Sequence, residues 1–217
     1  ADRKIFGTHC FESLRDALEI LVDASSSFPE IRQSKQMTRL REQLDSAIRS
    51  NPNSLAEARL LLGQLSFSIA ALEAEANAIP ISDESPVKWW AHAFSRQCQD
   101  FLHEFAELVP WTEHPSVRAF CDDFPELDEI PSLRSLAMLE AKLVPAIMHR
   151  LSSTTAAEKH GELSELQSLL TNAARYARER ISLLKGFALQ CDALSRMNYE
   201  FLYDKSRHLL SIGYNID

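Results

Sequence analysis

Glycine is scarce in this chain, which has five glycines among 217 residues. That is well below ordinary usage, and a turn-rich β fold would need many more, so the scarcity favours helices. Most of the nine prolines fall between stretches in which apolar residues recur every three or four positions, the spacing of one helix face. We therefore expect an all-α fold in which prolines separate the helices.

Cysteine is also rare, and its spacing argues against two kinds of site. The four cysteines stand far apart, and no two form the Cys-x-x-Cys pair that zinc and redox sites use. A chain of this length with so few cysteines does not suggest a disulfide framework, which favours a reducing compartment. We expect buried free thiols at Cys10, Cys98, Cys121 and Cys191.

Positive charge is in the minority, with 23 Lys and Arg against 31 Asp and Glu and a net charge of -8. Nucleic acids and anionic lipid surfaces attract basic faces, so we expect neither as a partner. No apolar run approaches the length of a membrane-spanning helix, and no signal peptide opens the chain. We expect no membrane insertion by this segment.

The patterns that mark common active sites are missing from the sequence. The seven histidines lack metal-ligand spacing, and there is no glycine-rich phosphate loop and no nucleophile elbow. Glu104 and Glu107 could form a carboxylate pair for glycoside chemistry, but surface glutamates on one helix are far commoner. The acidic stretch 122–129 has no glycine for a calcium loop, so we expect it to be solvated. The sequence thus predicts no catalytic, cofactor-binding or metal-binding residue.

The apolar periodicity predicts an antiparallel bundle of about six helices over residues 1–198. Ser54 and Glu57 form a capping box before the third helix, whose wide apolar stripe predicts a central position. Pro145 lies inside the fifth helix and should kink or restart it. The expected helices cover 4–24, 30–49, 55–77, 86–108, 132–151 and 163–198, with a short additional one at 116–121.

The last expected helix is the longest, and a β-hairpin is expected after it. Apolar residues from Leu163 to Leu194 step by three and four, except at Arg180, which breaks the series once; this seam is typical of antiparallel bundles and short coiled coils. Residues 199–217 predict a hairpin, with strand-like runs at 201–203 and 209–214 around a polar turn. The chain stops at Asp217 without a polar tail, so we expect a fragment of a larger protein whose next domain begins at the hairpin.

Two tryptophans are candidate contacts for sugar rings. Trp90 shares a helical stripe with Phe94 and Phe105, which predicts a place in the core. Trp89 should lie at the edge of that stripe, and Trp111 follows the helix, so Trp89 and Trp111 are the hypothetical sugar contacts.

The second expected helix has a basic outer side. Such a face could meet an acidic partner, but we expect it to be solvated. Its basic residues are Arg32, Lys35, Arg39 and Arg41.

The segment from Asn198 to Asp217 resembles a stretch of the cyclic β-1,2-glucan synthases. Phe201-Leu-Tyr-Asp204, Arg207 and Ser211-Ile-Gly-Tyr214 are similar to the phrase that opens the glycoamylase-like domain of that family. The chain departs from the family at residues 198–200, where members more often have an acidic or Asp-Phe phrase. Phrases at 89–91, 96–97, 110–111 and 130–133 are loosely similar to the helical region before that domain.

This resemblance implies a position inside a large enzyme on the cytoplasmic side of the bacterial inner membrane. The parent would polymerise glucose from UDP-glucose with a glycosyltransferase domain, and a glycoamylase-like (α/α)-barrel would take part in ring closure. Our chain would be a non-catalytic bundle between them, without cofactors, in contact with the other domains of the polypeptide and weakly with β-glucan. The family builds its glucan on a protein-linked intermediate, which makes Tyr176, Tyr199, Tyr203 and Tyr214 hydroxyl candidates, although packing is the favoured role for all four.

A free-standing helical protein–protein interaction module is the alternative. An unpaired hairpin edge would then recruit a partner strand or a second copy, as exposed strand edges do.

Overall fold

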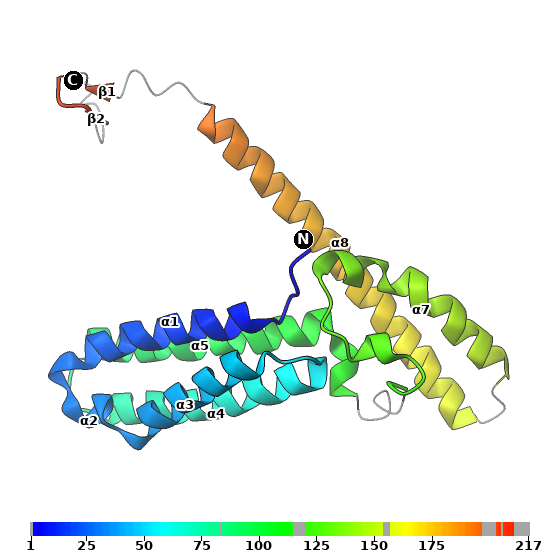
Figure 1. The fold of residues 1–217 in the computed structure, drawn as a ribbon, viewed down its shortest axis with the longest axis horizontal. Coiled ribbons are helices and arrows are strands. Elements are labelled where there is room, and N and C mark those ends of the chain that lie inside the picture. Colours follow the sequence, from blue (N-terminus) through cyan, green and yellow to red (C-terminus); the bar gives the residue numbers. More distant parts are fainter. Residues whose placement is uncertain are drawn as a thin grey trace. The chain divides into compact units, whose positions relative to one another are not determined.

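The computed structural model describes residues 2–82, 84–114, 120–153, 157–196, 203–204 and 206–210 (Figure 1). This part contains seven α-helices, which confirms the all-α class. The chain separates into two compact units, residues 1–178 and residues 179–217. The helices are α1 (Thr8–Ala24), α2 (Pro29–Arg32), α3 (Lys35–Ser50), α4 (Leu55–Ala78), α5 (Pro86–Leu108), α7 (Leu133–Ser153) and α8 (Ala157–Ser195), and short 3₁₀ turns cover Ser25–Ser27, Pro110–Glu113 and Pro125–Leu127.

Four helices of the first unit form an antiparallel bundle, fewer than the six or so predicted over residues 1–198. α1 packs against α3 and α5, and α4 packs against the same two helices. Consecutive long helices run in opposite directions (Figure 1), because the connections between them are short. The buried residues at the centre of this bundle include Leu14, Leu18, Leu40, Leu44, Leu62, Leu65, Phe94 and Phe105.

Two helix starts differ from the prediction. The first helix begins at Thr8 rather than Lys4, because the Ile5 N–H donates to Pro131 O at 2.9 Å and Lys4 bridges to Ser132. The prediction of a single helix over 30–49 is wrong. Ser34 has extended backbone angles, and its hydroxyl accepts the Met37 N–H at 3.1 Å, so it ends α2 and caps α3.

The N-terminus of α4 is held by residues close to it and by one far along the chain. The Ser54 hydroxyl accepts the Glu57 N–H at 3.2 Å, which confirms the serine cap. The Glu57 carboxylate accepts the Asn53 N–H at 3.0 Å, one residue before the amide that a capping box uses. Asp128 supplies two more acceptors: its backbone O takes the Leu55 N–H at 2.8 Å, and its Oδ1 takes the Ala56 N–H at 2.9 Å. The first amides of α4, which have no acceptor within the helix, are therefore satisfied.

The first unit also contains α7 and the first part of α8. α7 continues through Pro145, so the predicted restart there is wrong. α8 begins at Ala157, earlier than the predicted Leu163. The Arg178 guanidinium joins the two helices by donating to Ala137 O and Glu140 Oε2, both at 3.1 Å. Their buried apolar residues are Leu136, Leu139, Leu143 and Ile147 on α7 and Leu163, Leu166, Leu170, Ala173, Ala174 and Ala177 on α8.

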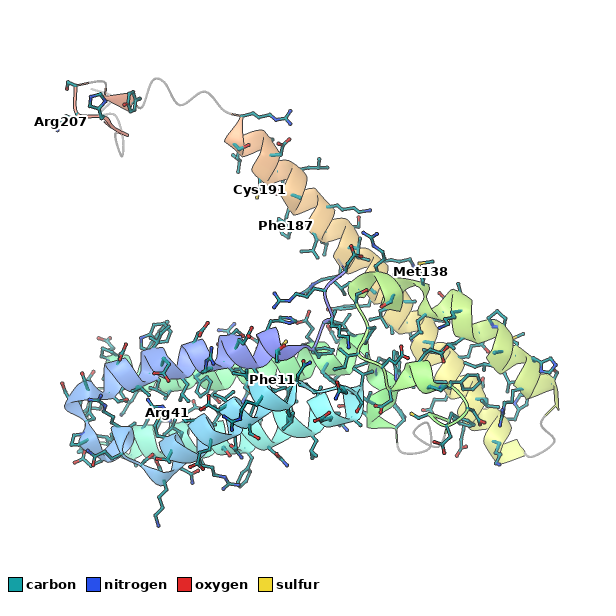
Figure 2. The ribbon with its side chains drawn as sticks, in the orientation of Figure 1. Phe11, Arg41, Met138, Phe187, Cys191 and Arg207 are labelled. Carbon is teal, nitrogen blue, oxygen red and sulfur yellow. The ribbon has the colours of Figure 1, made fainter. Side chains whose placement is uncertain are left out.

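The second unit contains the rest of α8 and a short strand pair. In this part of α8 the apolar side chains of the predicted seam are exposed rather than buried; they are Leu184, Phe187, Cys191 and Leu194. Figure 2 labels Phe187 and Cys191 on this part of the helix. The strands β1 (Tyr203–Asp204) and β2 (Leu209–Leu210) pair antiparallel. Most of the expected hairpin lies outside the described residues and stays a prediction. Of the short helix expected at 116–121, only Phe120 and Cys121 are described, and they lie in a turn.

The sequence observation about long apolar runs needs one correction. By length and composition alone, α4 is long and apolar enough to cross a membrane, with a mean hydropathy of 1.3 over its most apolar window. Polar and small residues interrupt the apolar residues of α4, so its mean hydropathy reveals this property and the length of an unbroken apolar run does not. In the fold, one face of α4 is buried against α3 and α5, while Leu60 and Phe67 on another face are exposed.

Replacing Asp128 with alanine should lower the free energy of unfolding by about 1 kcal/mol, the usual cost of losing a helix cap. Asp128→Asn keeps an acceptor oxygen and should cost less. Urea denaturation followed by far-ultraviolet circular dichroism measures both. Asp122→Ala is the matched control, because Asp122 is exposed and, unlike Asp128, does not cap α4. Equal losses in the two alanine variants would contradict the capping role.

Candidate functional site

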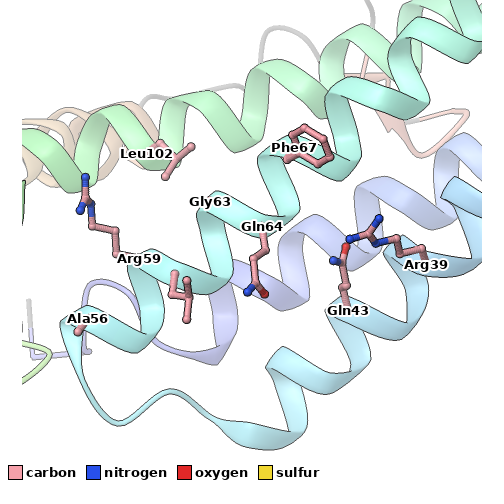
Figure 3. A pocket seen from close by; sticks show the side chains of 9 residues that line it. Arg39, Gln43, Ala56, Arg59, Gly63, Gln64, Phe67 and Leu102 are labelled. Carbon is pink, nitrogen blue, oxygen red and sulfur yellow. The ribbon is translucent and has the colours of Figure 1, made fainter.

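An open groove lies on the surface of the first unit between α3, α4 and α5. Its volume is about 710 Å³, within the range of ligand pockets, although it is open rather than enclosed. Figure 3 shows Arg39 and Gln43 entering it from α3, Gln64 and Phe67 from α4, and Leu102 from α5. No carboxylate is among the described residues that line it.

The polar side chains of the groove differ in whether they have hydrogen-bond partners. Arg59 is fixed, because its guanidinium donates to Thr112 O at 3.3 Å and to Glu113 Oε1 at 3.2 Å. Arg39 has no hydrogen bond or ion pair to any described residue. The Gln43 Oε1 atom is buried and receives no hydrogen bond. An unsatisfied buried acceptor costs free energy.

His9 and Cys10 form the one thiol–imidazole contact in the described structure, and the sequence analysis did not identify it. The Cys10 Sγ lies 3.6 Å from His9 Nε2, a spacing that suggests a nucleophile and its base. Burial, and then the nearby Glu104 carboxylate, raise the pKa of the Cys10 thiol to about 12. Burial, and then Arg3, lower the pKa of His9. The thiolate is therefore strongly disfavoured, and this pair is not a nucleophilic centre.

The other three cysteines differ in exposure: one is buried, one is half-buried and one is exposed. Burial raises the pKa of Cys98 to about 11, and its Sγ donates to Leu62 O at 3.8 Å. Cys121 is half-buried. Cys191 is exposed, so the expectation of a buried thiol is wrong there, because the apolar seam of α8 continues into the second unit without burial.

The exposures of Trp89 and Trp90 agree with the predicted helical stripe. The hypothesis of a sugar contact at Trp111 needs a correction. Trp89 is 59% exposed and meets Trp90 edge to face, with ring centroids 4.6 Å apart. Trp90 is half-buried and packs against the core. Trp111 is buried, and its indole N–H donates to Leu127 O at 2.8 Å. Trp111 is thus not available as a platform for sugar, which leaves Trp89.

The paired glutamates on α5 have different neighbours. Glu107 Oε1 lies 3.5 Å from His103 Nε2. Glu104 lies close enough to Cys10 on α1 for its charge to raise the pKa of that thiol. These contacts give the two carboxylates no shared function of the kind that glycoside chemistry uses.

The acidic stretch 122–129 is more ordered than a solvated loop. Glu126 lies 2.8 Å from the Lys142 ammonium, whose hydrogen bond lowers the pKa of that carboxyl. Asp123 pairs with Arg150 at 2.7 Å, and Asp128 caps α4. Within the described ranges, no three histidine, cysteine or acidic side chains gather as metal ligands.

The remaining candidates are dispersed over the molecule. Tyr176 packs against the core, and the Tyr203 hydroxyl lies 3.1 Å from His208 Nδ1. Tyr199 and Tyr214 lie outside the described residues. Of the remaining histidines, His92 pairs with Glu73 at 2.8 Å and His114 with Glu165 at 3.2 Å, while His149 and His160 are exposed.

No family model, no curated protein and no solved structure matches this chain. The groove between α3, α4 and α5 is therefore identified by its geometry and charge alone.

Alkylation with iodoacetamide at mildly alkaline pH should modify Cys191 quickly and leave Cys10 and Cys98 intact. At pH 8 a thiol of pKa about 12 is ionised in only about one molecule in ten thousand, and burial further restricts access. Peptide mass spectrometry over time gives the rate at each site. All three should react alike in urea, and a native Cys10 that reacts as fast as Cys191 would contradict the assignment.

Proposed function

We propose that this chain is a non-catalytic interdomain helical segment of a large membrane-associated cyclic β-1,2-glucan synthase. The observation that carries the proposal is the resemblance of residues 198–217 to the opening of the glycoamylase-like domain. In this proposal the bundle lies between the glycosyltransferase and the glycoamylase-like barrel, on the cytoplasmic side of the bacterial inner membrane. The parent polymerises glucose from UDP-glucose and cyclises the product, while this segment positions its neighbours.

Exposed apolar side chains on the described helices support a scaffold that contacts other domains. Leu183 and Phe187 are each 61% exposed on the second part of α8, and Leu194 is 56% exposed. Large apolar side chains gathered on one helix indicate a protein contact, because their exposure to water is unfavourable. In the proposal, residues 199–217 form the hairpin that begins the next domain, and β1 and β2 are its described part.

A free-standing helical protein–protein interaction module is the second candidate. The same exposed surfaces favour it, since an adaptor would also cover them with a partner. The two candidates differ in whether the coding sequence continues into further domains.

A weak contact with β-glucan is also part of the proposal, with Trp89 as the residue that would make it. An exposed indole can stack on a sugar ring, and Trp89 is the exposed member of the Trp89–Trp90 pair.

Sequencing the natural gene on both sides of this segment should find an open reading frame that continues in both directions. We expect a membrane-spanning glycosyltransferase before Ala1 and a long helical-barrel sequence after Asp217. A stop codon shortly after Asp217, without a transferase upstream, would refute the synthase proposal and leave the interaction module.

Incubating the pure chain with β-1,2-glucan should release no sugar. Titration at millimolar glucan should change the tryptophan fluorescence of the native chain but not of Trp89→Ala. The fluorescence of Trp111 should not respond to glucan because this side chain is buried, so it serves as an internal reference. Hydrolysis of the glucan would refute the non-catalytic assignment, and a response that survives Trp89→Ala would refute the sugar contact.

A further inference from the structure

Helix α4 has apolar residues on two faces, and only one of them is buried. The buried face contains Leu62, Leu65 and Leu72 and belongs to the core. On the other face, Leu60 is 61% exposed and Phe67 is 72% exposed. The exposed series Leu60, Gly63, Phe67, Ala70 and Ala74 steps by three, four, three and four. That spacing is the seam by which one helix packs along another.

Leu60, Gly63 and Phe67 of this seam line the groove between α3, α4 and α5, and Ala70 and Ala74 continue the seam along α4 beyond the lining. Gly63 is exposed, and a Cβ added there would meet no atom within 4 Å, so space is left above the backbone of α4. Phe67 and Leu102 add apolar surface from two different helices (Figure 3). Small residues next to large ones allow a second helix to approach closely between them.

The charge of the groove is opposite to that of the whole chain. The chain carries a net charge of -8, yet the described lining has two arginines and no carboxylate. Arg39 has no partner among the described residues, whereas Arg41, two residues on, pairs with Glu19 at 3.6 Å. Arg59 uses two of its donors on Thr112 and Glu113, and a guanidinium has five. Both arginines can therefore donate to a partner's carboxylates.

We propose that the groove binds one amphipathic helix of a protein partner, with an apolar stripe that packs on the α4 seam and acidic residues beside it. The exposed series from Leu60 to Ala74 covers about 21 Å of helix, or about four turns, which sets the length of the docked segment. Its apolar side chains pack between Leu60 and Phe67, and its carboxylates accept hydrogen bonds from Arg39 and Arg59. This inference depends on the first unit only and does not rest on the synthase proposal.

The probe is a synthetic helix of about four turns, stapled to hold its conformation, with leucine and alanine at alternating three- and four-residue steps and glutamate on both flanks. The control peptide has lysine in place of each glutamate. Fluorescence anisotropy with the full 217-residue chain gives the dissociation constants. We expect saturable binding of the acidic peptide, at least about tenfold tighter than the basic one, with the difference reduced by salt.

Matched variants test the charged and apolar contributions separately. Arg39→Glu should weaken binding of the acidic peptide about tenfold or more, while Arg49→Glu, an exposed change elsewhere on α3, should not. Phe67→Ser should weaken it similarly, while Met148→Ser, which removes an exposed apolar side chain on α7 outside the groove, should not.

Filling the groove provides a third pair of variants. Gly63→Leu has room for its side chain and should fold, yet it should obstruct the docked helix. Gly161→Leu also has open space around its side chain but lies on α8, so it should leave binding unchanged. Circular dichroism checks that each variant remains folded.

Four outcomes would overturn the proposal. They are equal affinity for the acidic and basic peptides, absence of saturable binding, equal losses in the groove variants and their controls, and tight binding by Gly63→Leu. Self-association abolished by Phe67→Ser, measured by analytical ultracentrifugation, would assign the groove to a second copy of the chain instead. Binding to phosphatidylserine vesicles that is lost in Phe67→Ser would assign it to a membrane surface.

Discussion

The structure of the first unit depends on the burial of one face of α4. This helix packs against both α3 and α5, and its core residues Leu62, Leu65 and Leu72 are almost fully buried. Burying one such side chain stabilises the fold by about 1.5–3 kcal/mol, so this face contributes more than any single hydrogen bond of the bundle. The N-terminus of α4 is fixed by Asp128, which follows the helix start by about 70 residues and so connects the four-helix part to the segment before α7.

The same burial keeps the other face of α4 in place. Leu60, Gly63 and Phe67 lie on a helix whose position is determined by the core, so the groove is preformed rather than assembled on binding. A rigid site loses less conformational entropy when a partner docks, which favours recognition of a helix by shape and charge. The helical bundle of the first unit and the exposed apolar residues on the second part of α8 are consistent with the proposal that this segment contacts other protein surfaces.

Much of the fold could be predicted from the sequence, because local patterns determine it. Ser54 caps the helix that it precedes, and the apolar spacing identified the long helices. The separation of α2 from α3 was missed, since Ser34 resembles an ordinary polar position until its backbone angles are known. The cap from Asp128 and the contact between His9 and Cys10 depend on tertiary structure, which the periodicity of a sequence does not report.

The candidate site was harder to predict than the fold. The sequence of the third expected helix shows a wide apolar stripe, but it does not divide that stripe into a buried face and an exposed one. Arg39 appeared as one of four basic residues on a solvated helix, and only the structure distinguishes it from Arg41, which pairs with Glu19. Cys191 was expected to be buried because its seam continues that of Leu170 and Ala177, which are buried in the first unit.

The most direct test of a two-faced α4 compares Leu65→Ala with Leu60→Ala in urea denaturation. The two leucines lie on one helix, but Leu65 is 1% exposed and Leu60 is 61% exposed. We expect Leu65→Ala to lower the free energy of unfolding by about 2–5 kcal/mol, because it leaves a cavity in the core. Leu60→Ala should change it by no more than about 0.5 kcal/mol. Similar losses in both variants would show that the outer face of α4 also belongs to the core, and would contradict a helix with one buried face and one free face.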